Sequence, residues 1–146
     1  SREALLGLAA AAGLADRLTL LPRLDDIRPL LRALDIGVVA SVSSEAICRV
    51  AMEYLALGVP VVGSALNSIP EMVPDDVAGL IVPPGDPAAL AEALARLLDD
   101  EALRQRLGAA GPAVADARFD LVRQLEKERT GAYQAPWTFS EATEGY

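Results

Sequence analysis

Residues 36–63 read IGVVASVSSEAICRVAMEYLALGVPVVG, and this stretch decides the fold. It begins with a continuous apolar run at 36–40, which is typical of a parallel strand that is covered on both faces. Apolar residues then recur at helical spacing over 47–57, and Gly58 provides a helix stop. A second apolar run at 59–63 predicts another buried strand. Strand, helix and strand in this order indicate a parallel β-α-β unit.

The flanking sequence continues this alternation. Short apolar runs predict two more strands, at 18–21 and 80–82. Helical spacing and capping residues predict helices at 2–13, from Asp25 or Asp26 to 32, from 87 to about 98, at 101–111 and at 120–133. Asp86 followed by Pro87 is a strong start signal. Ser68 and Glu71 match a capping box, in which the hydroxyl and the carboxylate bind the first free amides of a helix.

Alternating strands and helices predict the fold class, an α/β protein with a Rossmann-like, doubly wound parallel sheet. We expect one domain over residues 1–134 and an irregular tail at 135–146, where the sequence has no periodicity. The length of 146 residues suits a single domain, and the 52% share of hydrophobic residues is enough to form a core.

Charge and composition exclude several classes of function. The formal net charge of −8 argues against a nucleic-acid partner, because binding to phosphates requires clustered Lys and Arg. The chain contains no His, which removes imidazole catalysis and histidine metal sites. Cys48 is the only cysteine, so no internal disulfide or cysteine zinc cluster can form. No apolar run reaches the roughly 18 residues of a membrane span. We expect a cytoplasmic protein, with membrane-peripheral association of a full-length form as a variant of that expectation.

The polar stretch at 41–46 is the best candidate for a functional loop. Ligands of open parallel sheets bind beyond the carboxyl ends of the strands, and this loop joins such an end to a helix N-terminus, which attracts anions. Glu45 and Glu53 are eight residues apart, so about 10 Å or slightly more separates them along a helix. That distance suits two sugar rings joined by a diphosphate, because carboxylates accept hydrogen bonds from sugar hydroxyls. The alternative is that one glutamate favours the helix dipole and the other faces solvent.

The segment from Ser41 to Ser64, SVSSEAICRVAMEYLALGVPVVGS, resembles the E-x7-E signature of GT-B retaining glycosyltransferases of family 4. The flanking sequences LTLLP and IPEMVPDDVAGLIVPPGDPAALA agree with that family, and the resemblance extends from about Leu14 to Tyr133. It covers the C-terminal, nucleotide-sugar-binding half of such enzymes.

The resemblance implies a donor site and a role for each of its residues. Glu45 would be the catalytic glutamate that contacts the transferred sugar, and Glu53 would hold the ribose hydroxyls. The backbone amides of the segment from 46 to 50 would hold the donor diphosphate, and Arg23 would lie near the nucleotide base. The donor-binding residues implied are Ala46, Ile47, Cys48, Arg49, Val50, Glu53 and Arg23. The family implies no metal and no cofactor other than the nucleotide-diphosphate sugar, which is a substrate.

This sequence departs from the family pattern in two places. Glu45 is followed by Ala46-Ile47-Cys48 instead of Gly-Phe-Gly, and Asn67 and Ser68 replace two glycines. Missing glycines restrict how closely the backbone approaches a ligand. A second reading therefore stays open, that of a non-catalytic nucleotide-sugar-binding or assembly module.

The family's strand order predicts a gap in the sheet of this chain. Two strands separate the strands at 18–22 and 36–40 in the family, and this sequence contains neither of them. An N-terminal acceptor domain and a basic pair directed at the donor phosphates are also absent from it. We interpret the chain as an N-terminally truncated half that does not transfer sugar alone. An incomplete sheet edge at 36–40 further predicts self-association into a homodimer, because unpaired backbone groups are costly to bury.

Overall fold

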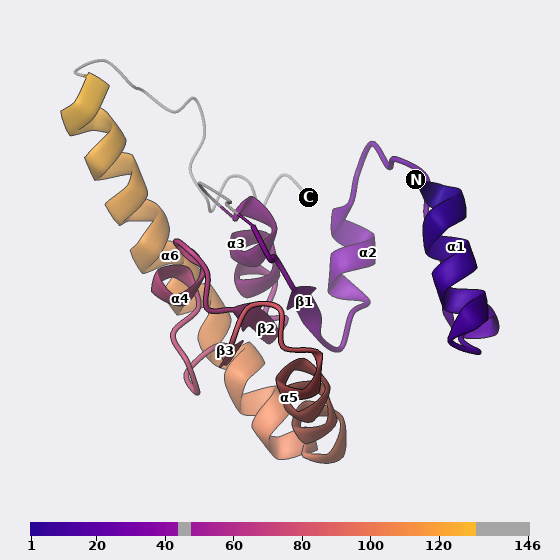
Figure 1. The fold of residues 1–146 in the computed structure, drawn as a ribbon. Helices are drawn as coiled ribbons and strands as arrows, with labels where there is room; N and C mark the ends of the chain where they lie inside the picture. Colours follow the sequence, from indigo (N-terminus) through magenta and orange to yellow (C-terminus); the bar gives the residue numbers. More distant parts are fainter. Residues whose placement is uncertain (44–47, 131–146) are drawn as a thin grey trace.

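The structure is a computed structural model that describes residues 1–43 and 48–130, with side chains described as far as residue 118. Ten elements follow one another along this part of the chain (Figure 1). In order they are α1 (Arg2–Ala11), η1 (Ala15–Arg17), α2 (Arg28–Arg32), β1 (Gly37–Val39), α3 (Arg49–Ala56), β2 (Val61–Ser64), α4 (Ile69–Met72), β3 (Gly79–Val82), α5 (Pro87–Asp99) and α6 (Glu101–Thr130).

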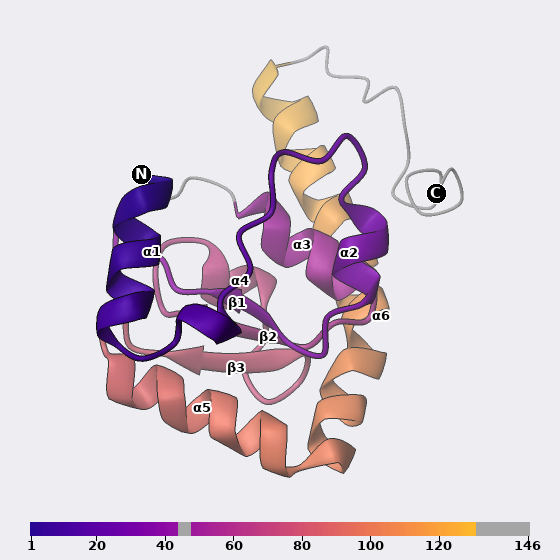
Figure 2. The same cartoon turned by 90° about the vertical axis from the view of Figure 1, so that its right-hand side faces the viewer.

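The described strands form one parallel sheet in the order β1-β2-β3. Val38 of β1 pairs with Val62 of β2, which pairs with Leu80 of β3. Helices α3 and α5 lie on opposite sides of this sheet, as Figure 2 shows, and α6 packs against both of them. The α/β class and the parallel sheet predicted from the sequence are confirmed.

The core consists of two clusters because successive residues of a strand face opposite sides of the sheet. Val61 belongs to the cluster under α3, together with Leu55 and Ile69. Its neighbour Val62 belongs to the cluster under α5, together with Leu97. All five of these side chains are fully buried. This alternation explains why the run at 59–63 is continuously apolar.

Helix α6 crosses α3 closely because two glycines face it. A Cβ atom at Gly108 would lie 2.5 Å from the carbonyl oxygen of Gly58, and one at Gly111 would lie 2.5 Å from that of Leu55. The predicted helices at 101–111 and 120–133 form one helix as far as Thr130, and the residues beyond it lie outside the described ones. Pro112 lies inside this helix, where a proline normally interrupts the backbone hydrogen bonds. Packing of this turn of α6 on α3 offsets the backbone hydrogen bond that the proline lacks.

Local start and stop signals at three other helix ends are confirmed. Gly13 and Gly58 have φ of 68° and 74°, the left-handed conformation in which helices commonly end. The Asp86 carboxylate accepts hydrogen bonds from the amides of Ala88 and Ala89, both at 3.0 Å, and caps α5.

The capping box predicted at Ser68 is wrong, although α4 does begin there. Ser68 has φ −79° and ψ −7°, and its hydroxyl makes no capping hydrogen bond. An N-cap residue normally has extended backbone, which directs its side chain at the free amides. Ser68 is already helical, so the reciprocal bonds with Glu71 cannot form as predicted.

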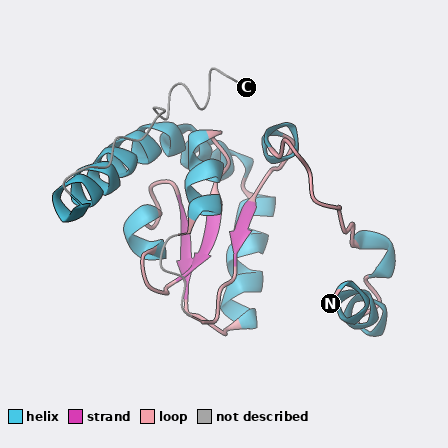
Figure 3. Cartoon of the chain, turned by 90° about the horizontal axis from the view of Figure 1, so that it is seen from above, coloured by secondary structure: helices cyan, strands magenta, loops and turns pink. Residues whose placement is uncertain are grey.

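The strand predicted at 18–21 is also wrong, since these residues form no strand. Figures 1 and 3 show that α1 and η1 lie apart from the three strands. A strand requires a neighbouring strand to pair its N–H and C=O groups. In the part of the chain that is described, no strand lies between this segment and β1.

The region before residue 43 leaves much apolar surface in contact with water. Helix α1 buries none of its residues, and Val38 of β1 is 40% exposed rather than covered on both faces as expected. The exposed large apolar residues of this region are Leu5, Leu6, Leu8, Leu14, Leu18, Leu21, Leu24, Ile27, Val38 and Val42.

Candidate functional site

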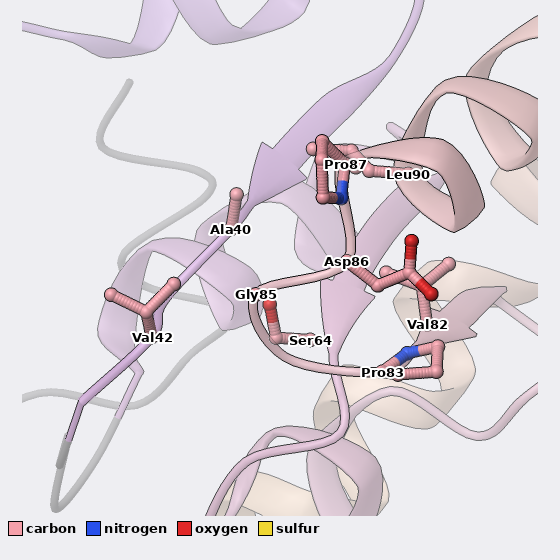
Figure 4. A pocket seen from close by; sticks show the side chains of 9 residues that line it. All are labelled: Ala40, Val42, Ser64, Val82, Pro83, Gly85, Asp86, Pro87 and Leu90. Atoms are coloured by element: carbon pink, nitrogen blue, oxygen red, sulfur yellow. The ribbon is translucent and has the colours of Figure 1, made fainter.

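The carboxyl ends of all three strands meet at one edge of the sheet, because the strands are parallel and paired in register. The segment after β1, the turn after β2 and the loop between β3 and α5 therefore lie together. A cavity of about 220 Å³ opens at this edge, and its lining comes from the segment after β1, from the last residue of β2, and from the end of β3 through the loop into α5 (Figure 4). The edge is the place where doubly wound sheets bind ligands.

The start of α3 borders this edge and has the properties of an anion site. Cys48 precedes the helix with extended backbone, at φ −88° and ψ 80°, and its side chain is 2% exposed. Its thiol is thus packed into the core, and only its backbone can face a ligand. The first amides of a helix have no carbonyl partner in a preceding turn, so those of Arg49 and Val50 suit an anion.

Glu53 lies one helical turn beyond Arg49 on α3, and the two residues share one side of the helix. The Glu53 side chain is half-buried. No hydrogen bond or ion pair joins its carboxylate to another described residue. A half-buried carboxylate without a protein partner is suited to accept hydrogen bonds from ligand hydroxyls.

Tyr54 shows how α3 is held against β1. A Cβ atom at Gly37 would lie 2.5 Å from a ring carbon of Tyr54, so the missing side chain at Gly37 gives the ring its place on the strand. Burial raises the pKa of the Tyr54 phenol, and the charges of Cys48 and Glu53 raise it further. This packing fixes the position of the helix that carries the site.

The remaining predicted site residues are placed less completely. Glu45, Ala46 and Ile47 lie outside the described residues. The helix begins at Arg49, so the axial distance expected between the two glutamates rests on residues that are not described. Arg23 is exposed in the segment between η1 and α2. Among the described residues, no hydrogen bond or ion pair connects Arg23 with α3.

Two features of the edge were not predicted as parts of a site. Ser64, at the end of β2, is 3% exposed and lines the cavity with Asp86, which we expected only as a helix cap. The position of Ser64 directly after the predicted strand at 59–63 was the available signal. Asn67 has φ 48°, a conformation that asparagine tolerates better than most residues. Residue 67 thus has a left-handed backbone although it is not glycine.

Comparison with known proteins identifies the class. The family model described as "Glycosyl transferases group 1" matches residues 1–100. The chain belongs to this family, as its sequence predicted.

Curated relatives include a glycosyltransferase and a mannosyltransferase. One is the D-inositol 3-phosphate glycosyltransferase of Salinispora tropica, 42% identical over 105 residues, which are 70% of this chain and 22% of that protein. Another is the phosphatidyl-myo-inositol mannosyltransferase of Mycobacterium leprae, 38% identical over 112 residues, which are 75% of this chain and 30% of that protein. The chain thus spans less than a third of the length of either relative.

Solved structures agree on the fold. Anabaena Alr3699/HepE in complex with UDP superposes with a TM-score of 0.80 at 26% identity, over 89% of this chain and 36% of that one. The C-terminal domain of a glycosyl transferase group 1 family protein (LpcC) from Francisella tularensis superposes with a TM-score of 0.69 at 26% identity, over 81% of this chain and 62% of that one. The fold is Rossmann-like and similar to GT-B glycosyltransferases, with a sheet of three described parallel strands.

Two other features are absent from the described residues. No described helix is long and apolar enough to cross a membrane. No group of three or more acidic or cysteine side chains within 1–43 and 48–118 is arranged to hold a metal ion.

Proposed function

We propose that the chain binds a nucleotide-diphosphate sugar at the carboxyl edge of its sheet, as the donor half of a retaining glycosyltransferase. The single observation that carries this proposal is Glu53, a half-buried carboxylate without a described partner on the helix that begins at this edge. The family supports it, and so does HepE, which was solved with UDP and with UDP-glucose.

Each part of the site has a separate task in this proposal. Glu53 accepts hydrogen bonds from the ribose hydroxyls, and Glu45 contacts the transferred sugar. The backbone amides from 46 to 50 hold the diphosphate, so the negative charge is met by the helix N-terminus and no metal ion is required. Arg23 contributes near the nucleotide base. Because the Cys48 side chain is buried, that residue acts through its backbone alone.

The test of donor binding is calorimetric titration of the chain with UDP, GDP and ADP. Glu53→Gln is expected to weaken the preferred nucleotide about 5- to 150-fold, which corresponds to about 1–3 kcal/mol for a charge-assisted hydrogen bond. Glu92→Gln on α5, an exposed glutamate, is the matched control and should bind as the wild type does. Equal affinity of the Glu53→Gln variant would rule out the ribose role.

Transfer itself is expected only from a longer protein that contains this chain. We propose that the 146-residue chain is inactive alone, because transfer requires acceptor groups and closure around the reacting centre. In such a longer protein, Glu45→Gln should reduce turnover far more than nucleotide affinity. Both relatives carry an inositol compound in their names, so inositol-containing acceptors are the first to test. Sugar transfer by the isolated chain would contradict this part of the proposal.

The second candidate function is a non-catalytic nucleotide-sugar-binding or assembly module. The replacement of glycines at Ala46, Cys48 and Ser68 favours it, since side chains there limit how closely a ligand approaches. Hydrolysis of UDP-, GDP- and ADP-sugars by a longer protein separates the two candidates. Tight nucleotide binding without turnover of any donor would identify the module.

We also propose that the isolated chain forms a homodimer through the apolar surface before residue 43. The outer edge of β1 has no described neighbour, and Val38 on it is 40% exposed. Residues 1–35 contain five arginines and five acidic residues, so this region is neutral and the charge of −8 resides elsewhere. Two copies can therefore bring this surface together without bringing like charges together. A solution of the purified chain contains no other protein. The apolar surface before residue 43 is therefore expected to pack against the same surface of a second copy.

Sedimentation velocity of the purified chain tests the homodimer. The wild type is expected to sediment as a dimer at about 100 µM and to dissociate on dilution. Val38→Asp should shift it to the monomer, because the new charge would be buried in the interface. Leu98→Asp is the matched control on α5, where Leu98 is 64% exposed, and it should leave the dimer intact. A wild-type monomer at all concentrations would overturn this proposal.

A further inference from the structure

The cavity at the carboxyl edge lies on the α5 side of the sheet. Figure 4 shows it between the segment that leaves β1 and the loop from Pro83 to Pro87 that enters α5. We propose that this cavity is a binding site for a small uncharged group that combines an apolar part with one hydrogen-bonding oxygen or nitrogen. The proposal does not rest on donor binding, because it uses neither Glu45 nor Glu53.

Ser64 is the buried polar residue of the cavity lining. It is 3% exposed and is the only buried polar residue among those described. Figure 4 shows its side chain directed toward the loop that carries Gly85. The hydroxyl makes no hydrogen bond with another described residue. Every fully enclosed side-chain oxygen or nitrogen in the described part has a partner, so the unpaired Ser64 oxygen is one that the cavity reaches.

The position of Ser64 in β2 makes this hydroxyl unusual. Ser64 follows Val62 by two residues, so both side chains face α5, where Val62 is part of the apolar core. A valine at 64 would continue that core. A largely buried hydroxyl without a hydrogen-bond partner destabilises the folded chain. A ligand that supplies a donor or an acceptor removes this cost, and the free energy gained favours binding.

The walls of the cavity select an uncharged ligand. They consist mainly of apolar side chains, among them Ala40, Val42, Val82, Pro87 and Leu90. Asp86 also lines the cavity, and one of its carboxylate oxygens already accepts two amide hydrogen bonds from α5. Its negative charge disfavours anions, so a phosphate does not fit here as it would at the start of α3.

The size of the cavity limits the ligand to a small molecule or to one group of a larger molecule. About 220 Å³ holds more than a single water. Pockets for drug-sized ligands are larger, at about 300–1,000 Å³. A branched alkyl amide of about six heavy atoms is a suitable probe, and its expected dissociation constant is millimolar.

The experiment titrates the full chain with isobutyramide and monitors the backbone amides by ¹H–¹⁵N correlation spectra. Saturable shifts are expected at Ala40, Val42, Ser64 and Leu90. Isobutyrate, which has the same shape with a negative charge, is expected to cause none. Ser64→Ala should weaken isobutyramide about 5- to 10-fold by removing the hydroxyl, and Ser64→Leu should abolish binding by filling the space. Leu98→Ala, on the exposed side of α5, is the control with unchanged binding.

Three results would overturn the proposal. The first is the absence of saturable shifts up to 100 mM isobutyramide. The second is equal binding of isobutyrate, which would mean that charge does not matter. The third is unchanged binding by Ser64→Leu, which would place the probe elsewhere. Thermal unfolding of each variant checks that it is folded, and Ser64→Ala, the smallest change, keeps the test valid if Ser64→Leu does not fold.

Discussion

The regions before and after residues 44–47 have similar apolar content but bury it to different degrees. From residue 48 to residue 118, apolar residues enter two clusters that cover both faces of β2 and β3. In the region up to residue 43, α1 buries none of its residues, and the region holds ten of the twelve exposed large apolar residues found among the residues whose side chains are described. The difference lies in the neighbours of each region. An apolar run becomes a core strand only where a second strand pairs with it and a helix covers it.

The largest effect is expected from truncating a leucine in each region. Leu55 is fully buried between α3 and the sheet, so Leu55→Ala should lower the free energy of unfolding by about 2–5 kcal/mol. Leu8 on α1 is 69% exposed, so Leu8→Ala should change it by less than about 0.5 kcal/mol. Urea denaturation of both variants, at a dilution where sedimentation shows a monomer, measures the contrast. A large loss from Leu8→Ala under that condition would contradict the exposure of α1.

A pair of glycine substitutions should change stability in opposite directions. A Cβ atom at Gly108 would lie 2.5 Å from the Gly58 carbonyl oxygen, so Gly108→Ala should separate α6 from α3 and cost about 1–3 kcal/mol. Gly7 lies inside α1 with nothing within 4 Å of its Cβ position. Gly7→Ala should stabilise the helix by about 0.5–1 kcal/mol, because alanine loses less backbone entropy. Thermal unfolding distinguishes the two signs, and stabilisation by Gly108→Ala would contradict the close crossing.

Removal of a helix cap should have a smaller effect. Asp86→Ala removes two amide hydrogen bonds at the start of α5 and should cost about 0.5–2 kcal/mol. Asp26 accepts one amide hydrogen bond, from Arg28, at the start of the five-residue helix α2. Asp26→Ala should cost less, since α2 buries only Leu31. Urea denaturation measures both, and a greater loss from Asp26→Ala would reverse the ranking of the two regions.

The smallest effect is expected from the ionisation of Tyr54. Burial, with the charges of Cys48 and Glu53, raises the pKa of this phenol above its ordinary value of 10.0 in the folded chain. Between the ordinary and the raised value, the folded state holds a proton that the unfolded state has released. The contribution of Tyr54 to the free energy of unfolding is therefore fully present below pH 10, and it is lost as the pH rises through the raised pKa. Tyr54→Phe should reduce this alkaline loss in urea midpoints measured from pH 9 to 11. An identical loss in the wild type and in Tyr54→Phe would show that the ionisation of Tyr54 does not cause it.

Local chemistry made much of the fold predictable. The cap at Asp86 and the stop at Gly58 depend on a few neighbouring residues, and both are found. The strands at 36–40, 59–63 and 80–82 were predicted from apolar runs, and the structure has a strand in each. The candidate site was predictable in part, because Glu53 and the start of α3 follow from spacing and from resemblance to the family.

Several features depended on contacts between distant parts of the chain. Residues 18–21 have the composition of a strand, but no described strand pairs with them. Pro112 should interrupt a helix, but packing of α6 on α3 holds both of its sides in one helix. Ser64 gained its importance from the loop before α5, about 20 residues later, which encloses it within the cavity.

The sequence by itself determined the class of fold, the family and most helix ends, because apolar periodicity, turns and caps act over a few residues. Tertiary structure alone decided three outcomes. It decided which apolar runs became strands, that the two helices predicted on either side of Pro112 form one helix, and that the Ser64 hydroxyl lines a cavity. Those outcomes depend on pairing and packing between residues that are distant in sequence. Backbone groups at 18–21 and the hydroxyl of Ser64 acquire partners only if another segment brings them.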